Sequence, residues 1–360
     1  MPVAAARVSA APVTVTDVLG QEVSLDAPVR RVLLGEGRQI HAVAALDRDD
    51  PFSRIVGWGD DLEKADPDTY RAYVERFPQA AALPKFGSMS VGGFDIERAI
   101  ALRPDVLLLN YEAQRAGAEL GLVAKLAAVG IAVLYVDFRH APFRNTEPSL
   151  RLLGRLFGRE KEAQRLIAFR AEQIERVTTP VANAAKLERP LVMLDRIPGY
   201  SDGCCLSFGR ENFGRMVEIA GGRNLGSELL PGTFGVINPE TIVTRDPEVV
   251  IVTGGNWNAL APGGSWVGLG PGADPAEARR KLAALAQRPA FAHGRAVTSQ
   301  RMHAIWHQFY NSPHQFVALQ RIASWLHPEI FTDLDPDATM RTLHERFLPL
   351  PYSPGYWVSL

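Results

Sequence analysis

The sequence contains few cysteines, almost no net charge and no long apolar run. Its only two cysteines, Cys204 and Cys205, are adjacent, which excludes both a framework of several disulfides and a cysteine-based zinc cluster. We expect two reduced side chains in the core, with a strained vicinal disulfide as the alternative. The 39 Lys and Arg residues are balanced by 40 Asp and Glu residues, so the totals indicate no nucleic-acid partner. No apolar run approaches the roughly 20 residues that a membrane span requires.

What the sequence does contain is a regular alternation of strand and helix patterns. Apolar runs such as 106–109 and 249–252 are typical of parallel strands buried on both faces, and helical patterns separate them. The chain of 360 residues is long enough for two domains, and its 46% hydrophobic content lets each half bury its own core. The pattern predicts an α/β fold class with two Rossmann-like lobes and parallel sheets.

One long helix is predicted between the two lobes, from 159 to about 186. Its apolar positions recur close to every 3.6 residues, at Ala163, Leu166, Ile167, Ala171, Ile174 and Val177. Such a helix runs roughly 30–40 Å, and Pro180 either kinks it or ends it. We therefore expect an N-terminal lobe at 13–145, connecting helices at 146–188 and a C-terminal lobe with an extension at 189–360.

Two segments, FDIERAIALRPDVLLLN and INPETIVTRDPEVVIVT, repeat one pattern. Glu97 aligns with Glu240 and Pro104 with Pro247 at one constant offset, and each acid follows a residue that caps helices. The match favours a duplicated lobe. Shorter patterns predict a hairpin at 14–26 and a strand at 295–298, just before the segment MHAIWHQFYNSPH.

These segments together resemble the periplasmic substrate-binding proteins of ABC importers, in the rigid-helix class (class III) that carries ferric siderophores, haem and cobalamin. The resemblance rests on TVTDVLGQEVSLDAPVRRVL, DIERAIALRPDVLLLN, GGRNLG with the following INPETIVTRDPEVVIVTGG, and the single long helix, and it spans about 13–326. It implies a ligand held between two lobes, little hinge motion, and delivery to an inner-membrane permease by a monomer without enzymatic activity or resident cofactor. The tail beyond 326 is longer than in cobalamin-type members and is closer to iron-complex binders.

The resemblance also implies a periplasmic location. The first dozen residues, MPVAAARVSAAP, lack the apolar segment of an intact signal peptide and fit the remnant of a trimmed one.

Ligands of open parallel sheets bind at the carboxyl ends of the strands, so the residues that follow strands are the candidate site. Arg donates paired hydrogen bonds to anionic groups, and aromatic rings supply stiff contact area. A set rich in Arg and aromatic residues suits a bulky anionic ligand. Acidic residues at such positions, Glu36, Asp60 and Glu112, are fewer than the Arg and aromatic residues. The candidates are Arg38, Trp58, Ser88, Met89, Tyr111, Arg139 and His140 on the first lobe, and Arg196, Tyr200, Phe208, Arg210, Phe234, Trp257, Arg301, His303, Trp306 and Tyr310 on the second.

Each candidate also has an ordinary structural explanation. A single Arg is more often a solvated or structural charge, and Trp residues often pack within a lobe. His303, His307 and His314 suggest a metal site, but no further matched ligand accompanies them, and direct metal binding is the minority interpretation. Glu97 and Glu240 fit the helix dipole, whereas the resemblance implies that they dock onto permease arginines.

The leading hypothesis is a binding protein that captures a ferric siderophore and passes this metal chelate to an ABC transporter permease. Haem and cobalamin are the alternatives within the class, and haem would need an axial ligand such as Tyr200, Tyr310 or His303. A chelatase-like enzyme is a further alternative. The sequence shows no nucleophile with a matching base, no phosphate-binding loop and no cysteine ligand set, so we expect no enzymatic activity.

Overall fold

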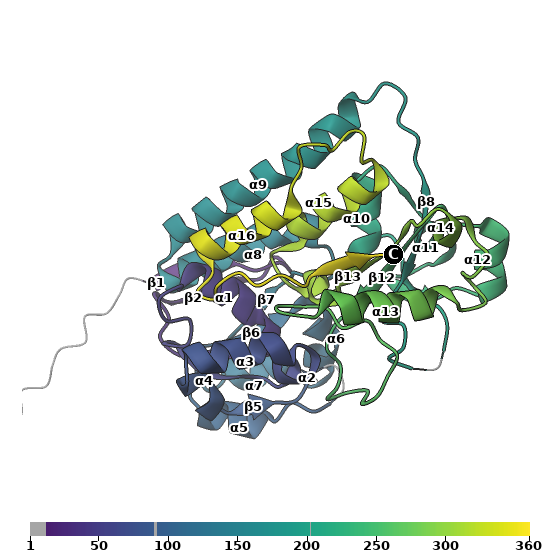
Figure 1. Ribbon diagram of the computed structural model, residues 1–360. Coiled ribbons are helices and arrows are strands. Elements are labelled where there is room, and N and C mark those ends of the chain that lie inside the picture. The colour runs from purple at the N-terminus through teal and green to yellow at the C-terminus, as the bar shows by residue number, and fades with distance from the viewer. Residues whose placement is uncertain (1–11, 90–91, 202) are drawn as a thin grey trace, which may run out of the picture.

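The computed structural model describes residues 12–89, 92–201 and 203–360, and it shows two α/β lobes bridged by one long helix (Figure 1). Each lobe contains a five-stranded sheet. We call the part built on the first sheet the N-lobe and the part built on the second sheet the C-lobe. Two short segments of predicted loops, 90–91 and 202, lie outside the described residues.

The N-lobe sheet has the strand order β5-β4-β3-β6-β7, and all of its pairings are parallel. Its strands are β3 (Val32–Leu34), β4 (Ile55–Gly59), β5 (Lys85–Phe86), β6 (Val106–Asn110) and β7 (Ala132–Val136). Its helices are α1 (Ile40–Leu46), α2 (Asp61–Ala65), α3 (Pro67–Arg76), α4 (Gln79–Ala82), α5 (Ile96–Ala101), α6 (Gln114–Glu119) and α7 (Leu122–Ala127). The predicted hairpin is confirmed as the antiparallel pair β1 (Pro12–Thr16) and β2 (Glu22–Asp26).

The C-lobe sheet has the order β10-β8-β12-β13-β14, with only β14 antiparallel among its described pairings. Its strands are β8 (Leu191–Asp195), β10 (Arg223–Asn224), β12 (Val249–Gly254), β13 (Met302–Trp306) and β14 (Trp357–Ser359), and β9 (Leu206–Phe208) pairs separately with β11 (Phe234–Val236). Its helices are α10 (Phe213–Ile219), α11 (Leu225–Leu229), α12 (Pro239–Arg245), α13 (Pro275–Ala286), α14 (Arg295–Thr298) and α15 (Gln315–Leu326).

The prediction of a strand at 295–298 is wrong, because this segment is the helix α14 and the strand β13 begins later. The hydroxyl groups of Thr298 and Ser299 donate hydrogen bonds to the carbonyl of Arg295, at 3.1 and 2.6 Å, which supports the helical turn. Residue 301 immediately precedes β13, which begins at Met302, and residue 303 lies inside the strand. Neither position therefore follows a strand, as the site prediction assumed.

The long helix is confirmed as α9 (Glu160–Asn183), which runs from one lobe to the other along one side of the molecule (Figure 1). The helix before it, α8 (Pro142–Phe157), ends at Gly158, whose left-handed φ of 64° terminates the helix without strain. Pro180 lies inside α9, close to its end. The buried face differs from the prediction in several places, since Ala171 is exposed while Phe169, Arg170 and Gln173 are buried.

The C-terminal extension covers parts of both lobes. Its helix α16 (Pro336–Phe347) packs on α15 and α1, and Phe347 and Phe169 of α9 lie with ring centroids 5.3 Å apart. The Arg48 side chain of the N-lobe donates to the carbonyl oxygen of Leu348 at 2.9 Å. Strand β14 then closes the edge of the C-lobe sheet against β13.

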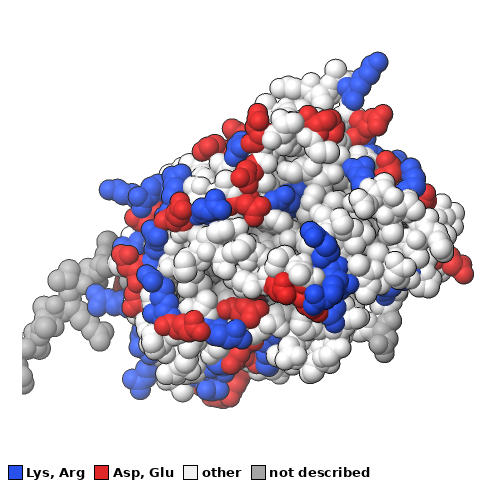
Figure 2. Space-filling view, in the orientation of Figure 1, with Lys and Arg blue, Asp and Glu red and all other residues white. Residues whose placement is uncertain are grey.

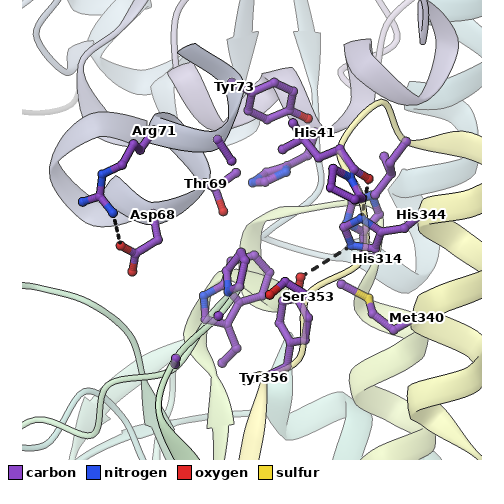
Figure 3. Close-up of a pocket in the computed structure, with 18 of the residues that line it drawn as sticks. His41, Asp68, Thr69, Arg71, Tyr73, His314, Met340, His344, Ser353 and Tyr356 are labelled. Carbon is purple, nitrogen blue, oxygen red and sulfur yellow. Dashed lines mark hydrogen bonds and ion pairs between the residues drawn. The ribbon is translucent and has the colours of Figure 1, made fainter. Parts of the chain in front are cut away.

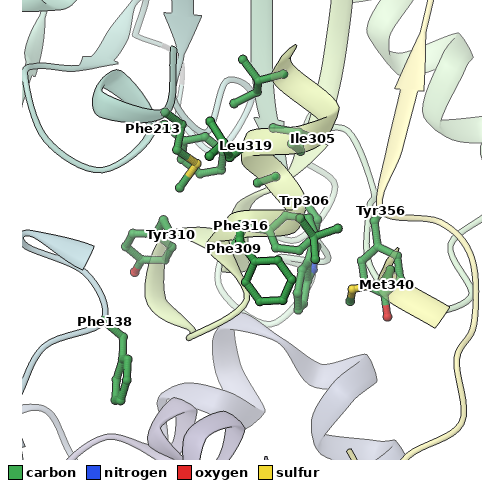
Figure 4. Close-up of a cluster of buried hydrophobic side chains, with 14 of the residues drawn as sticks. Phe138, Phe213, Ile305, Trp306, Phe309, Tyr310, Phe316, Leu319, Met340 and Tyr356 are labelled. Carbon is green, nitrogen blue, oxygen red and sulfur yellow. The ribbon is translucent and has the colours of Figure 1, made fainter. Parts of the chain in front are cut away.

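The buried apolar side chains of both lobes form one continuous cluster, which contains Val32 of the first sheet, Leu166 of α9 and Ile251 of the second sheet. Figure 4 shows part of this cluster, which includes Phe138 of the N-lobe, aromatic side chains of the C-lobe such as Phe309 and Phe316, and Met340 of the extension. Only a smaller cluster, on the other face of the first sheet, is confined to the N-lobe. Each half buries apolar side chains, as the composition allows, but the buried side chains of the two halves are joined into one cluster.

The structure also bears on the expectations for the two cysteines and for membrane spans. Cys204 and Cys205 form a vicinal disulfide, which corrects the expectation of two reduced side chains. None of the helices in the described ranges is both long enough and apolar enough to cross a bilayer. On the face drawn in Figure 2, acidic and basic side chains intermingle without a large region of one sign.

Candidate functional site

Arg38 is held at the carboxyl end of β3 by a close approach of two loops. A Cβ atom on Gly59 would lie 2.7 Å from the backbone nitrogen of Gly37, so both positions depend on glycine. This approach brings the Asp61 carboxylate within 2.5 Å of the Gly37 nitrogen and 2.7 Å of the Arg38 Nε. The Arg38 side chain is thereby aimed away from its own lobe and toward the C-lobe.

Three arginines from both lobes gather around one tyrosine. Arg38 Nη1 donates to the Tyr310 hydroxyl at 2.6 Å, and the guanidinium carbons of Arg38 and Arg139 lie 5.4 and 5.8 Å from the Tyr310 ring centroid. Arg196, which follows β8, is close enough to Arg38 and Arg139 to interact with them electrostatically. We call Arg38, Arg139, Arg196, Tyr310 and the neighbouring Glu36 the interlobe arginine cluster.

Glu36 is the acid that holds this cluster together. Its carboxylate accepts hydrogen bonds from Arg139 Nη2 at 2.8 Å and from the Asn311 amide at 3.0 Å. Burial acts to raise the pKa of Glu36, but Arg139, Arg38 and Asn311 outweigh it and hold the pKa below its ordinary value. Glu36 is therefore ionised, and it links the N-lobe arginines to the C-lobe segment after β13.

Tyr310 is electrostatically unusual for a buried phenol. Burial acts to raise the pKa of Tyr310, yet the positive charges of Arg38 and Arg139 outweigh it, so the net direction is downward. A phenol under these conditions is a stronger acid and, once deprotonated, a ready ligand for a hard cation such as ferric iron.

Arg196 differs from the other two arginines because it has no carboxylate partner among the described residues. Its guanidinium lies 4.6 Å from the Phe234 ring centroid and 5.8 Å from that of Phe208, and its Nε is buried without a hydrogen-bond acceptor in the described part of the chain. Burial, with the charges of Arg139 and Arg38, lowers the pKa of Arg196. An incoming anion would supply the missing partner.

Backbone and amide contacts hold the two lobes together around the cluster. The Asn212 amide donates to the carbonyl oxygens of Arg139, at 2.5 Å, and Tyr310, at 2.8 Å. Asn212 adopts a positive φ of 58°, a conformation that Asn tolerates better than most residues. Gln308 donates to the Ala65 carbonyl at 2.6 Å. Sequence reasoning missed Asn212, because a residue before a helix reads simply as its cap.

Of the other predicted site residues, several lie at strand ends on exposed or half-buried positions. Tyr111 and His140 stack with ring centroids 4.6 Å apart at the ends of β6 and β7. Tyr200 and Phe234 are exposed, Ser88 is half-buried, and the exposed Arg210 donates to the carbonyl of Ser227. The structure gives these residues accessible surface, but it does not bring all of them to the arginine cluster.

A second group of predicted site residues packs inside the lobes. Trp58 is only 1% exposed and contacts Phe52 and Tyr70, and Met89 is likewise in the N-lobe core. Phe208, Trp257 and Trp306 are buried in the C-lobe. For these side chains, packing within a lobe explains their position without a contact to the ligand.

Arg301 immediately precedes β13 and His303 lies within it, and both contact elements near the C-terminus, α15 and β14. Arg301 donates to the carbonyls of Trp325 and Leu326, and His303 stacks on Trp325 with centroids 4.5 Å apart. Of the other two histidines considered for a metal, His307 contacts Thr253 and His314 lies beside His41. Within the described residues, no three His, Cys, Asp or Glu side chains are arranged to hold a metal ion.

Glu97 and Glu240 occupy the equivalent first turns of α5 and α12, and both side chains are exposed. Asp95 caps the first helix by accepting from Arg98, and Asn238 caps the second by accepting from Glu240. The two helices lie far apart, on different lobes (Figure 1).

Comparison with solved structures supports the fold over nearly the whole chain. A TroA-like periplasmic binding protein, FepB, from Veillonella parvula has a TM-score of 0.87 at 24% identity, covering 97% of this chain and 100% of its own. Molybdate-bound MolA from Haemophilus influenzae has a TM-score of 0.71 at 16% identity, and the match covers 95% of this chain and 99% of MolA. A periplasmic haem-binding protein from Pseudomonas aeruginosa has a TM-score of 0.57 at 20% identity, and the match covers 83% of this chain and 93% of that protein.

Comparison with curated protein sequences gives no significant match. A family model described as periplasmic binding protein matches residues 32–305, which is most of the chain and includes both sheets and the long helix. This chain therefore belongs to the periplasmic binding protein family, as a non-catalytic solute-binding component of an ABC importer.

Proposed function

We propose that this protein captures an anionic metal chelate, a ferric siderophore, between its lobes and delivers it to the importer's permease. The observation that carries the proposal is Arg196, a partly buried cation without a carboxylate partner in the described residues, beside Arg38 and Arg139. Ferric siderophores present catecholate, hydroxamate or carboxylate oxygens, and guanidinium groups bind such oxygens in pairs.

The surroundings of Arg196 support a bulky ligand rather than a small ion. Phe234, which its guanidinium contacts, is 38% exposed, so aromatic surface is available beside the charge. Aromatic side chains contribute large contact areas at little cost in conformational entropy. In such a complex the siderophore would wrap the iron, and the protein would contact organic groups.

The first test is a titration of the protein with a panel of ferric siderophores, followed by tryptophan fluorescence. We expect saturable one-to-one quenching by at least one member, and none from bare ferric ion. Arg196→Gln should weaken binding at least tenfold, since a hydrogen bond to a charged group is worth roughly 1.5–3 kcal/mol. Arg210→Gln is the matched control, because Arg210 is exposed and outside the cluster. Tight binding of cobalamin with no response to any siderophore would refute the assignment.

Haem is the second candidate, and Tyr310 is the observation that favours it. Of the three possible axial ligands, His303 is stacked on Trp325 and Tyr200 lies outside the cluster, whereas Tyr310 lies between two arginines that lower its pKa. Two of the similar structures are described with molybdate and as haem-binding, and both ligands carry negative charge. An absorption spectrum of the haem-loaded protein that changes in Tyr310→Phe would support haem; an unchanged spectrum would exclude Tyr310 as its ligand.

A further inference from the structure

A cavity of about 390 Å³ lies at the junction of the lobes, apart from the interlobe arginine cluster. Its walls come from α1 and α3 of the N-lobe, from the loop at 271–273, from Trp306 and His314 of the C-lobe, and from the C-terminal extension (Figure 3). No member of the arginine cluster lines it. Trp306 faces the cavity, whereas Gln308 and Tyr310, further along the same segment, contact Arg38.

Two buried histidines present polar atoms at this cavity without hydrogen-bond partners. His41 is 4% exposed and His314 is 2% exposed, and the Nε2 atoms of both lack a partner among the described residues. The rings contact each other edge to face, with centroids 5.7 Å apart. The hydroxyl of Thr69, another lining residue, is also buried without a partner there. Unsatisfied buried polar atoms are costly, and several of them around one cavity indicate a missing partner.

The third histidine at the cavity is, by contrast, fully engaged. His344 Nδ1 lies 3.0 Å from the Leu350 carbonyl oxygen, which can only accept, so Nδ1 donates. Its Nε2 then accepts from the Tyr356 hydroxyl at 3.5 Å. Among the three histidines that line the cavity, the unsatisfied ring nitrogens therefore belong to His41 and His314, which come from different lobes.

The imidazoles of this cavity are uncharged. Burial lowers the pKa of His41 to about 3, with further lowering by Arg38 and His344, and burial holds the pKa of His314 well below its ordinary value. A neutral imidazole nitrogen can donate or accept, depending on its tautomer.

Tyr73, Trp306 and Met340 supply aromatic and apolar wall surface. The lining also includes three charged residues of α3: Arg71 and Glu75 are exposed, and Asp68 is paired with Arg71 at 3.4 Å. A charged group placed between the two buried imidazoles would lose its hydration, and an anion there would also lie near the Asp66 carboxylate, whose Oδ2 is 4.0 Å from His41 Nε2.

We propose that this cavity is a second ligand site, which takes a small uncharged molecule with a flat apolar body and one polar edge bonded to His41 and His314. Its size falls within the roughly 300–1,000 Å³ of small-molecule sites. Such a ligand would contact both lobes and the extension at once. The proposal does not depend on the identity of the chelate at the arginine cluster.

Three probes of nearly the same shape test the proposal: benzamide, which is neutral, benzoate, which is an anion, and benzamidine, which is a cation. Binding is measured by calorimetry and by ¹H–¹⁵N spectra of protein labelled at histidine. We expect benzamide to shift the signals of His41 and His314, and the two charged probes to bind at least tenfold more weakly. Equal or tighter binding of a charged probe, or no binding of any probe, would overturn the proposal.

A variant that fills the cavity tests whether the probe binds there. Ala72→Trp introduces an indole from α3 into the cavity without removing any polar group, and Ala81→Trp on α4 is an exposed control. Benzamide affinity should fall at least tenfold in the first variant and stay unchanged in the second, while ferric siderophore binding is unchanged in both. Ser353→Phe fills the cavity from the opposite wall if Ala72→Trp does not fold. Retained benzamide binding in a folded, filled variant, or Zn²⁺ shifting both histidine signals and displacing benzamide, contradicts the inference.

Discussion

Replacing Glu36 with Gln should lower the stability of the protein and raise its affinity for an anionic ligand at the same time. The substitution keeps the shape of the side chain but removes the negative charge between Arg139 and Arg38. Removing one partner of a buried ion pair costs about 3–5 kcal/mol. The Glu36 side chain is 16% exposed and Gln still offers one acceptor, so we expect about 2–3 kcal/mol.

The effect on binding has the opposite sign. Without Glu36, the three arginines face only Asp61 and Glu112, so the cluster gains a net positive charge. One unit charge about 10 Å from the ligand contributes about 1.7 kcal/mol at an effective dielectric constant of about 20, which is more than tenfold in affinity.

The pH dependence of stability checks the same group. A carboxyl whose pKa is lowered by folding stabilises the protein fully above its unfolded pKa and loses that contribution as the pH falls through its folded pKa. The ordinary value for Glu36 is 4.5 and the folded value is lower. The stability difference between the wild type and Glu36→Gln should be largest above pH 4.5 and shrink below it.

Urea denaturation and siderophore titration of the same variant give both quantities. Glu277→Gln is the control, because it removes the acid of an exposed ion pair with Arg280 on α13, where the change should stay within about 0.5 kcal/mol. A loss of stability accompanied by unchanged or weaker siderophore binding would show that the cluster only locks the lobes together, and the proposed anion site would be wrong.

Three further results are expected. The double variant Glu97→Arg with Glu240→Arg should fold and bind ligand normally but lose ligand-dependent uptake, because like charges at a docking surface cost several kcal/mol. Normal uptake would contradict the docking role and leave only the interaction with the helix dipole. Small-angle scattering with and without ligand should give nearly equal radii of gyration, since bending α9 breaks backbone hydrogen bonds, and a large closure would contradict this. Asp66→Asn should stabilise the protein increasingly between pH 4 and pH 7, by up to about 2–4 kcal/mol. Burial raises the pKa of Asp66 to about 7, so in this range the carboxyl ionises in the unfolded wild-type chain but stays protonated in the folded protein, which lowers the free energy of unfolding. Equal pH profiles of the two proteins in urea denaturation would refute this prediction.

Much of the fold is predictable from the sequence where one chemical pattern persists over a whole element. The wholly apolar runs of β6 and β12 and the long period of α9 are of this kind. The segment 295–298 and β14 are not, because four residues or fewer take their structure from their neighbours. β14 exists because β13 offers an unpaired edge, which no local pattern in 357–359 announces.

The candidate site is predictable only in part, for a similar reason. Arg38, Arg139, Arg196 and Tyr310 could be named because they follow strands that end at one side of their sheets. The acid that holds them together could not be predicted, because Glu36 does so through hydrogen bonds to Arg139 and Asn311, which lie far away in the sequence. The sequence predicts that Trp58 follows its strand, but β4 extends to Gly59 and contains it, and its side chain packs inside the lobe.

The continuous core has a consequence for how the protein unfolds. Because the buried side chains of both sheets, α9 and the extension belong to one cluster, neither lobe can lose its structure without exposing apolar surface of the other. The two lobes should therefore melt in one cooperative calorimetric transition. A chain divided within α9 would leave each half with an uncovered apolar face, so the separate halves would aggregate unless they reassociate.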